Sequence, residues 1–476
     1  REAVVEYLNA VKKDPRYADA HLKLADTYVK LGNGSQALRE YVNAADLMPG
    51  NKDVQLKAGT ILMLAKRYED ARTRAEKALK LDPSNLEAML LRSNATFALK
   101  DLDGAIAQVE EAIRLDPKAA RSYTLLGAIE AARGDAAAAE RAHRQAVEMD
   151  PQSPLAHLAL GQFLAGMGRQ DDAEASFKQA YSLDSKNPLP ARALAAFYIA
   201  SNRAAEAEPY LRSLADQSSE IGPTLALADY YVAMNRPADA AALLVKHTSR
   251  KDGGDQATVR LAGIRYGQGQ TADAHKLIDG LIARNPKNAQ ALIVKARFLA
   301  QEKKVEEAIV KAKAAVGADP RSADGFYVLG SLLASRQRTD EAIAAFTEVL
   351  KLNPRAAAAQ IQLAQLQMSS GKPDAALQAA QAATAAEPGS LAAHLVLTRT
   401  LMASGDLGRA EDEVKLLESK LPRNPAVLNL KGTLLIAKRD LPGARAAFEM
   451  AIQSEPNSNE ALAGLVALDV AERKQA

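Results

Sequence analysis

The chain contains no cysteine and no tryptophan, and aromatic residues make up only 4% of its 476 residues. Without cysteine there is no disulfide, no thiolate metal ligand and no cysteine nucleophile. Large rings are scarce, whereas 48% of the residues are hydrophobic and alanine is abundant. The core must therefore come from close packing of small and aliphatic side chains. The composition is that of an ordered chain, long enough for about three average domains.

An excess of charge of one sign and long apolar runs are also missing. Lysine and arginine number 61 against 58 aspartate and glutamate residues, which leaves a net charge of +3. Because phosphate backbones require clustered positive charge, nucleic acid is not an expected partner. No apolar run approaches the roughly 20 residues that span a bilayer. The chain opens at Arg1 without methionine or a signal peptide, so we expect membrane association only through a missing N-terminal anchor.

Prolines mark a regular interval along the chain. Eleven of them fall into two runs in which each lies 34 residues after the one before: Pro15, Pro49, Pro83, Pro117 and Pro151, then Pro286, Pro320, Pro354, Pro388, Pro422 and Pro456. The same interval continues through Ser185, Ser218 and Asp252, with one residue lost before Ser218. We take each of these residues as position 0 of a repeat. Thirteen complete repeats fit between Pro15 and Pro456.

Two positions of the repeat carry only small side chains. Position 22 is alanine in all thirteen repeats, from Ala37 to Ala444. Position 10 is alanine, glycine, serine or threonine in every repeat, from Ala25 to Gly432. Two antiparallel helices approach closely only where neither carries a bulky side chain, and one repeat has room for two short helices and two turns. The pattern predicts helical hairpins whose helices cross at these small residues.

Helix ends recur at the same interval. Position 17 is glycine in six repeats and is otherwise polar, which predicts the end of a first helix. The proline at position 0 ends the second helix. Ser84-x-x-Glu87 and Asn457-x-x-Glu460 predict capping boxes that open the next first helix.

This order of small residue, tyrosine or leucine, glycine, alanine, aromatic residue and proline resembles the tetratricopeptide repeat family over the whole chain. The resemblance implies an all-α, right-handed superhelical solenoid of antiparallel helix pairs. Thirteen repeats would be flanked by a leading second helix over 1–13 and a trailing first helix over 459–473. The chain departs from the family at position 6, where the usual tryptophan is never found. Tyrosine is kept at position 13 only in Tyr28, Tyr198 and Tyr231.

The regularity of the repeats divides the chain into three parts. Residues 1–184 form a regular N-terminal arm, and residues 286–476 form a regular C-terminal arm that ends in a capping helix. Between them, residues 185–285 lose the proline, drop one residue and carry Gly222-Pro223 and Gly253-Gly254. Simple degeneration of the repeat accounts for these changes, and a bend in this central part is the alternative prediction.

Residues that break a repeat are the candidates for chemistry. Four histidines lie where the family has bulky packing side chains: His21, His157 and His394 at position 6, and His143 at position 26. His247 and His275 have no partner histidine or carboxylate at helical metal-binding spacing that the repeat pattern does not already explain. The glycines around Gly253 follow no predicted strand and precede no Gly-Lys-Ser/Thr. We therefore expect no metal, no cofactor and no enzymatic activity.

The family resemblance places positions 4, 7, 11 and 14 of each first helix in a concave groove. Position 7 is apolar in ten repeats: Leu22, Leu56, Leu90, Leu158, Leu225, Val259, Ile293, Tyr327, Ile361 and Leu395. Position 11 adds polar groups that suit a peptide backbone: Asp26, Asn94, Gln162, Asp229, Arg297, Ser331, Gln365 and Arg399. We predict that the two rows bind a protein or peptide segment. The alternative is that the apolar row only packs against neighbouring first helices.

Acidic residues open three of the first helices at position 4. They are Asp19, Asp53 and Glu87, and with Asp26 they would form an acidic entrance to the groove. The simpler interpretation, which we prefer at this stage, is that the helix dipole favours carboxylates in a first turn.

The amino-acid sequence of the C-terminal repeats is also similar to that of bacterial repeat lipoproteins of exopolysaccharide export and exosortase (PEP-CTERM) systems. The segments that carry this likeness are 424–432, 438–441 and 444–449. The resemblance implies a periplasmic scaffold tethered to the outer membrane that engages exopolysaccharide machinery. Two alternatives remain, namely the substrate-recognition arm of a larger enzyme such as a glycosyltransferase, and a cytoplasmic regulatory scaffold.

Overall fold

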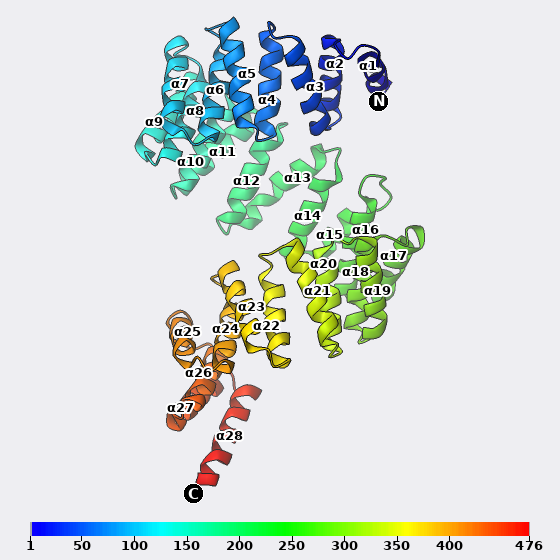
Figure 1. The fold of residues 1–476 in the computed structure, drawn as a ribbon, viewed down its shortest axis with the longest axis vertical. Helices are drawn as coiled ribbons and strands as arrows, with labels where there is room; N and C mark the ends of the chain where they lie inside the picture. The colour runs from blue at the N-terminus through cyan, green and yellow to red at the C-terminus, as the bar shows by residue number, and fades with distance from the viewer. Residues whose placement is uncertain (1, 476) are drawn as a thin grey trace. The chain divides into compact units, whose positions relative to one another are not determined.

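The computed structural model describes the backbone of residues 2–475 and the side chains of residues 2–470. Within that range it contains 28 α-helices, one short 3-10 helix and no strand (Figure 1). Within each compact unit of the chain, consecutive helices pack side by side as antiparallel pairs, and first helices also contact the first helix of the next repeat, as in α4–α6 and α24–α26. The predicted all-α solenoid of helix pairs is confirmed.

The chain divides into two compact units, which we call the N-terminal unit (1–234) and the C-terminal unit (235–476). The helices of the N-terminal unit are α1 (Glu2–Lys13), α2 (Ala18–Lys30), α3 (Gly34–Leu47), α4 (Lys52–Leu64), α5 (Tyr68–Leu81), α6 (Leu86–Ala98), α7 (Leu102–Leu115), α8 (Ala120–Arg133), α9 (Ala136–Met149), α10 (Pro154–Gly166), α11 (Gln170–Leu183), α12 (Pro188–Ala200), η1 (Ala204–Ala207), α13 (Glu208–Gln217) and α14 (Ile221–Ala233). The boundary falls inside the central part that the sequence marks as irregular, whereas the three-part division and the bend stay predictions.

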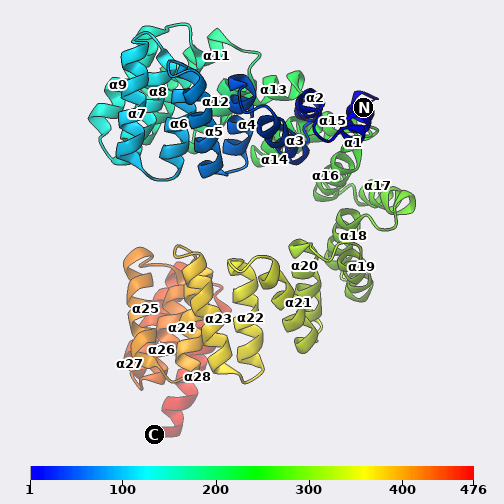
Figure 2. The same cartoon turned by 45° about the horizontal axis from the view of Figure 1, so that its top comes forward.

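The C-terminal unit continues the same alternation of first and second helices. Its helices are α15 (Pro237–Val245), α16 (Gly254–Gly267), α17 (Thr271–Arg284), α18 (Ala289–Gln301), α19 (Val305–Ala318), α20 (Ala323–Ser335), α21 (Thr339–Leu352), α22 (Ala357–Ser369), α23 (Pro373–Ala386), α24 (Leu391–Ala403), α25 (Leu407–Lys420), α26 (Pro425–Ala437), α27 (Leu441–Ser454) and α28 (Asn459–Gln475). Figure 2 shows α22 to α27 as successive pairs lying side by side. The leading and trailing helices are confirmed as α1 and α28, with Arg1 outside the described residues.

The small residues lie where the helices cross. All thirteen alanines at position 22 are 0% exposed. Glycine at position 10 makes room for a ring at position 26 of the same repeat. A Cβ atom built on Gly161 would lie 2.7 Å from the Phe177 ring, and one on Gly330 would lie 3.0 Å from Phe346. The two positions are therefore matched in size, as close packing requires.

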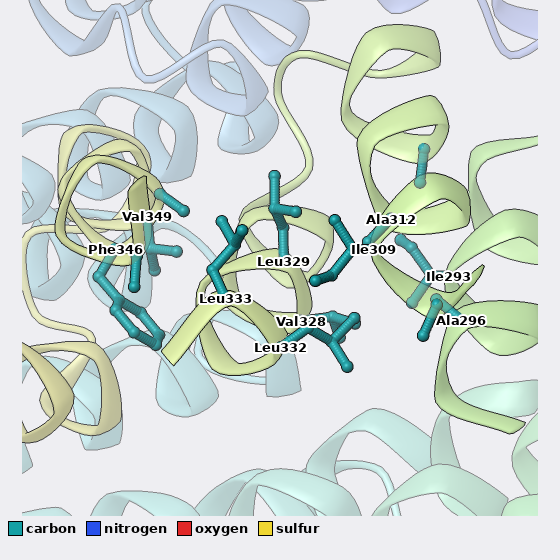
Figure 3. Packing of buried hydrophobic residues seen from close by; sticks show 14 of the residues in the cluster. Ile293, Ala296, Ile309, Ala312, Val328, Leu329, Leu332, Leu333, Phe346 and Val349 are labelled. Carbon is teal, nitrogen blue, oxygen red and sulfur yellow. The ribbon is translucent and has the colours of Figure 1, made fainter. Parts of the chain in front are cut away.

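Core clusters extend over several successive hairpins. In one cluster, Ala296 of α18 and Ala312 of α19 pack with Leu333 of α20 and Phe346 of α21 (Figure 3). Each repeat thus completes its core with side chains of the following repeat, the contact pattern of a solenoid.

Every turn between the paired helices uses one conformation. Position 17 has positive φ in all thirteen repeats, at six glycines and seven polar residues. At the end of α2, the Asn33 N–H donates to the Tyr28 carbonyl oxygen at 2.9 Å, and the Gly32 N–H donates to Val29 at 3.0 Å. These bonds satisfy the last free carbonyl groups of the helix. The predicted helix ends are confirmed.

The predicted capping boxes are wrong by one or two residues. Helix α6 begins at Leu86, so its cap is Asn85, whose side chain accepts from the Ala88 N–H at 2.9 Å. Ser84 lies outside the helix and donates to Asp82 instead. Helix α28 likewise begins at Asn459, two residues after Asn457. Glu87 is consequently not held by a capping box.

Repeat six departs from the common hairpin at its second helix. Every other repeat except the seventh has a 14-residue second helix, whereas here the 3-10 helix η1 covers 204–207 and α13 begins only at Glu208. Pro209 lacks the N–H that would bond the carbonyl group four residues earlier, which explains the change. Aromatic contacts hold α13 in place, because Tyr210 stacks on Tyr198 at 5.9 Å and meets Tyr181 edge-on at 5.1 Å.

Replacing a crossing alanine should destabilise the fold. Ala308→Leu adds three carbon atoms at a fully buried contact between α18 and α19, which should cost about 1–3 kcal/mol of unfolding free energy. Chemical denaturation followed by circular dichroism measures this change. Ala314→Leu is the matched control, since Ala314 is an exposed residue of the same helix. Equal effects of the two substitutions would contradict the crossing role of position 22.

Candidate partner-binding groove

The histidines take part in local packing and hydrogen bonding. His21 is buried and its ring contacts Glu40 at 2.6 Å and the Pro15 carbonyl oxygen at 3.1 Å. His394 makes the equivalent contacts to Glu413 at 2.7 Å and Pro388 at 3.1 Å. The half-buried His157 contacts the Pro151 carbonyl oxygen at 3.0 Å. The histidine side chains at position 6, where the family has tryptophan, thus contact the preceding turn.

His143 and His275 lie in different surroundings. His143 sits over Gly127, and burial lowers its pKa to about 4 because no hydrogen bond compensates the charged ring. His275 contacts the Glu302 carboxylate at 2.6 Å and the Lys295 ammonium group at 2.8 Å, although Glu302 is 27 residues away. Sequence spacing gave no sign of the Glu302 contact.

The described residues contain no group of three or more histidine, cysteine, aspartate or glutamate side chains that could hold a metal ion. In the same range, no helix is both long and apolar enough to cross a membrane. The distinctive surface features of the described residues are grooves along the helices.

A groove runs over the first helices of the N-terminal unit. One part has a volume of about 680 Å³ and is bounded by α4, α6, α8 and the start of α10. Its lining combines apolar side chains with a few polar ones: Thr60, Met63, Leu64, Leu86, Glu87, Leu90, Leu91, Asn94, Arg121, Thr124, Leu125, Ala128 and Leu155. Every one of these residues belongs to a first helix, as the family resemblance implies for a ligand groove.

A second part of about 470 Å³ adjoins the first. It shares Thr60, Leu64 and Glu87 with the first part and extends toward α2 and α3: Val29, Tyr41, Asp53, Leu56, Lys57 and Ile61 complete its lining. We call the two parts together the N-terminal groove. Exposed apolar side chains stand along it, with Leu64 75% exposed and Leu155 50% exposed. Such a continuous apolar surface is typical of a protein contact site.

One wall of the groove is a compact polar cluster. Asp26 accepts hydrogen bonds from the Tyr41 hydroxyl at 2.6 Å and from the Lys57 ammonium group at 2.9 Å. Burial raises the pKa of Asp26, but these two hydrogen bonds and the charge of Lys57 outweigh it and lower the pKa below its ordinary value. Burial, followed by the bond to Asp26, raises the pKa of Tyr41. The charge of Lys57 is thus already balanced.

The predicted apolar row at position 7 lies deeper than expected. Leu56, Leu158, Leu225 and Ile293 are buried, and the other six residues are half-buried: Leu22, Leu90, Val259, Tyr327, Ile361 and Leu395. Contact between successive first helices of one unit, as between α4 and α6 or between α18 and α20, covers side chains such as Leu56 and Ile293, which is the alternative that the sequence leaves open. Leu56 and Leu90 still line the N-terminal groove, where they form its floor.

The predicted polar row at position 11 is mostly exposed. The exposed members are Asn94, Gln162, Asp229, Arg297, Gln365 and Arg399. Asn94 lines the N-terminal groove, whereas Arg297 pairs with Asp324 at 2.5 Å and Arg399 with Glu460 at 3.2 Å. Asp26 is half-buried, and the Ser331 hydroxyl donates to the Tyr327 carbonyl oxygen.

The C-terminal unit has a smaller groove of about 460 Å³ between α22 and α24. Gln365, Met368, Ser369, Val396 and Arg399 line it. Its predicted members, Gln365 and Arg399, again come from position 11.

Several groove residues escape the sequence pattern. Leu64 at position 15 and Arg121 and Leu155 at position 4 line the N-terminal groove, yet none belongs to the predicted rows. The signal that could have found Arg121 and Leu155 is position 4 itself, read across successive repeats. Leu64 has no such signal, because its exposure follows from where α4 ends.

These features define an α-solenoid of helix pairs whose first helices line its grooves. Family models described as tetratricopeptide repeat match residues 56–120, 124–188, 259–323, 327–390 and 367–434, and one described as TPR repeat matches residues 1–32. The chain belongs to the tetratricopeptide repeat family.

Solved structures resemble the fold at low sequence identity. Naa15/Naa10 bound to HypK-THB is 14% identical over 98% of this chain and 88% of that one, with a TM-score of 0.46. The Cut9–Hcn1 hetero-tetramer of the APC/C is 16% identical over 99% and 92%, with a TM-score of 0.41. YrrB, a TPR protein with an unusual peptide-binding site, is 20% identical over 39% and 95%, with a TM-score of 0.34. No curated protein matches the sequence.

Acid should destabilise the N-terminal unit through His143. Its pKa lies at about 4 in the folded chain and at 6.5 ordinarily, so below pH 6.5 the unfolded chain binds a proton that the folded chain does not. This difference should cost about 2 kcal/mol at pH 5. His143→Phe, which copies the glycine–phenylalanine pairing of Gly161 and Phe177, should remove that loss.

Chemical denaturation at pH 7 and pH 5 measures the effect. His157→Phe controls for replacing a histidine, since His157 is only half-buried. If His143→Phe keeps the acid sensitivity of the parent chain, burial of the neutral ring is not its cause.

Proposed function

We propose that this chain is a non-catalytic scaffold for protein–protein interaction that binds a partner segment in the N-terminal groove. The observation that carries the proposal is a continuous apolar groove with exposed leucines, lined only by first helices over most of its length. In such a groove, apolar side chains of a ligand gain free energy by leaving water, while Thr60 and Asn94 offer hydrogen bonds to its backbone.

The exposure of Leu64 and Leu155 supports binding over internal packing. A side chain that only completes the core would be covered, as Leu56 is, whereas these two face solvent over most or half of their surface. They come from helices three repeats apart along the chain, α4 and α10, so one bound segment would contact both ends of the cavity.

Charged substitutions at the groove should abolish partner capture. We expect Leu64→Asp with Leu155→Asp to weaken a groove ligand at least tenfold, because each removes an apolar contact and adds a charge that must be desolvated. Helicity should stay unchanged, since both side chains are exposed. Peptides selected from a random display library on the full chain, then titrated by fluorescence anisotropy, provide the measurement.

Leu81→Asp with Leu115→Asp is the matched control. Both leucines are 45% exposed and close the second helices α5 and α7, away from the groove lining. Selected peptides that bind all three proteins equally would show that the groove is not the binding site.

We further propose a setting in bacterial envelope polysaccharide export or assembly, in the periplasm with tethering to the outer membrane. The support is the likeness of the C-terminal repeats to lipoproteins of those systems. The substrate-recognition arm of a larger enzyme and a cytoplasmic regulatory scaffold are the alternatives. The complete gene tests all three, because an upstream lipobox cysteine supports the first, a downstream catalytic domain the second, and neither feature the third.

A further inference from the structure

Position 4 of the first helices forms an ordered row on the N-terminal unit. Six successive first helices, α2 to α12, carry these residues there: Asp19, Asp53, Glu87, Arg121, Leu155 and Leu189. All six are exposed, with Leu189 at 53%. The row therefore passes from three carboxylates to one guanidinium group and then to two leucines. Four of its members line the N-terminal groove, namely Asp53, Glu87, Arg121 and Leu155.

The four charged side chains of this row have no ion pair or side-chain hydrogen bond with any described residue. By contrast, Lys57 on α4 pairs with Asp26, and Asp324, which holds position 4 of α20, pairs with Arg297. The Glu87 carboxylate is free to contact a ligand, because Asn85 rather than Ser84 caps its helix and no capping box holds Glu87.

Helix stability explains only half of the row. A helix N-terminus favours carboxylates, so Asp19, Asp53 and Glu87 fit the simpler interpretation. The same dipole disfavours Arg121, which also lies in the first turn of its helix, and it has no bearing on the exposed Leu155. A ligand that contacts the whole row accounts for all of these residues together.

We infer that the N-terminal groove selects its partner by the order of charge along the segment. This inference rests on the proposed function and names the ligand chemistry. Basic side chains of the segment lie against Asp19, Asp53 and Glu87, an acidic group lies against Arg121, and bulky apolar side chains cover Leu155 and Leu189. The order of the three classes sets the direction of the segment in the groove.

The spacing of the repeats sets the spacing of these classes. Packed helices lie roughly 8–10 Å apart, and an extended chain covers this distance in about three residues at about 3.3 Å each. An extended segment should therefore present one matching side chain every third residue. Charge pairs at an exposed groove edge are also screened by salt, so the selectivity should weaken as ionic strength rises.

Two synthetic fluorescein-labelled peptides of equal composition test the order. The ordered peptide has Lys at residues 1, 4 and 7, Glu at 10 and Leu at 13 and 16, with alanine and serine between. The permuted peptide places Glu, Lys, Leu, Leu, Lys and Lys at the same six residues. Anisotropy titrations on the full chain should show the ordered peptide binding about tenfold more tightly at low salt.

A charge exchange on the protein tests the residues themselves. Glu87→Lys with Arg121→Glu should weaken the ordered peptide about tenfold and should restore binding to a peptide with Glu at 7 and Lys at 10. Glu148→Lys with Arg141→Glu is the control, because both residues are exposed on the second helix α9 and form no ion pair with a described residue.

The outcomes separate this inference from the proposed function. If both peptides bind equally and still require Leu64 and Leu155, the groove binds segments but does not read their charge order, and the inference is overturned. If neither peptide binds while library peptides bind in the groove, the inference is again overturned and the proposed function stands. Loss of groove dependence for every peptide would overturn both.

Discussion

The structure depends on one steric constraint, the close crossing of two helices in every hairpin. Alanine at position 22 is fully buried in all thirteen repeats, and position 10 of the facing helix is always small. Where position 10 is glycine, as in Gly161 and Gly330, an aromatic ring fills the space that a Cβ would need. The stacked hairpins inherit this geometry, because each completes its core with side chains of the next. A chain without tryptophan thereby builds core clusters that extend over several hairpins.

The same repetition concentrates function where the repeats differ. Packing uses the recurring positions, so a side chain that recurs carries little information about a partner. The N-terminal groove is distinctive because its exposed leucines and its unpaired charges change from one repeat to the next. Position 17 has the same left-handed conformation in every repeat. Equivalent positions of successive first helices therefore stay in register, and the residues that differ between repeats form a row.

The sequence predicted correctly the features that depend on residue size at the helix crossings. It predicted incompletely the features that depend on contacts with a neighbouring repeat or on the local backbone path. The helix pairs and the buried alanines followed from spacing alone. The capping boxes were misplaced because Asn85 and Ser84 are both good caps, and only the backbone path shows which one accepts the bond. Ile293 at position 7 proved buried, because the next first helix, α20, covers it. The sequence did not predict that Pro209 would change the second helix of repeat six, whose first turn is a 3-10 helix.

By itself, the sequence determined the all-α repeat architecture, its period and the residues at which the helices touch, because a close helix crossing accepts only small side chains. Only the tertiary structure decided which side chains the stacked first helices cover and which they leave open, since this depends on contacts between residues a full repeat or more apart. The exposure of Leu64 and the unpaired state of Glu87 and Arg121 belong to that second class.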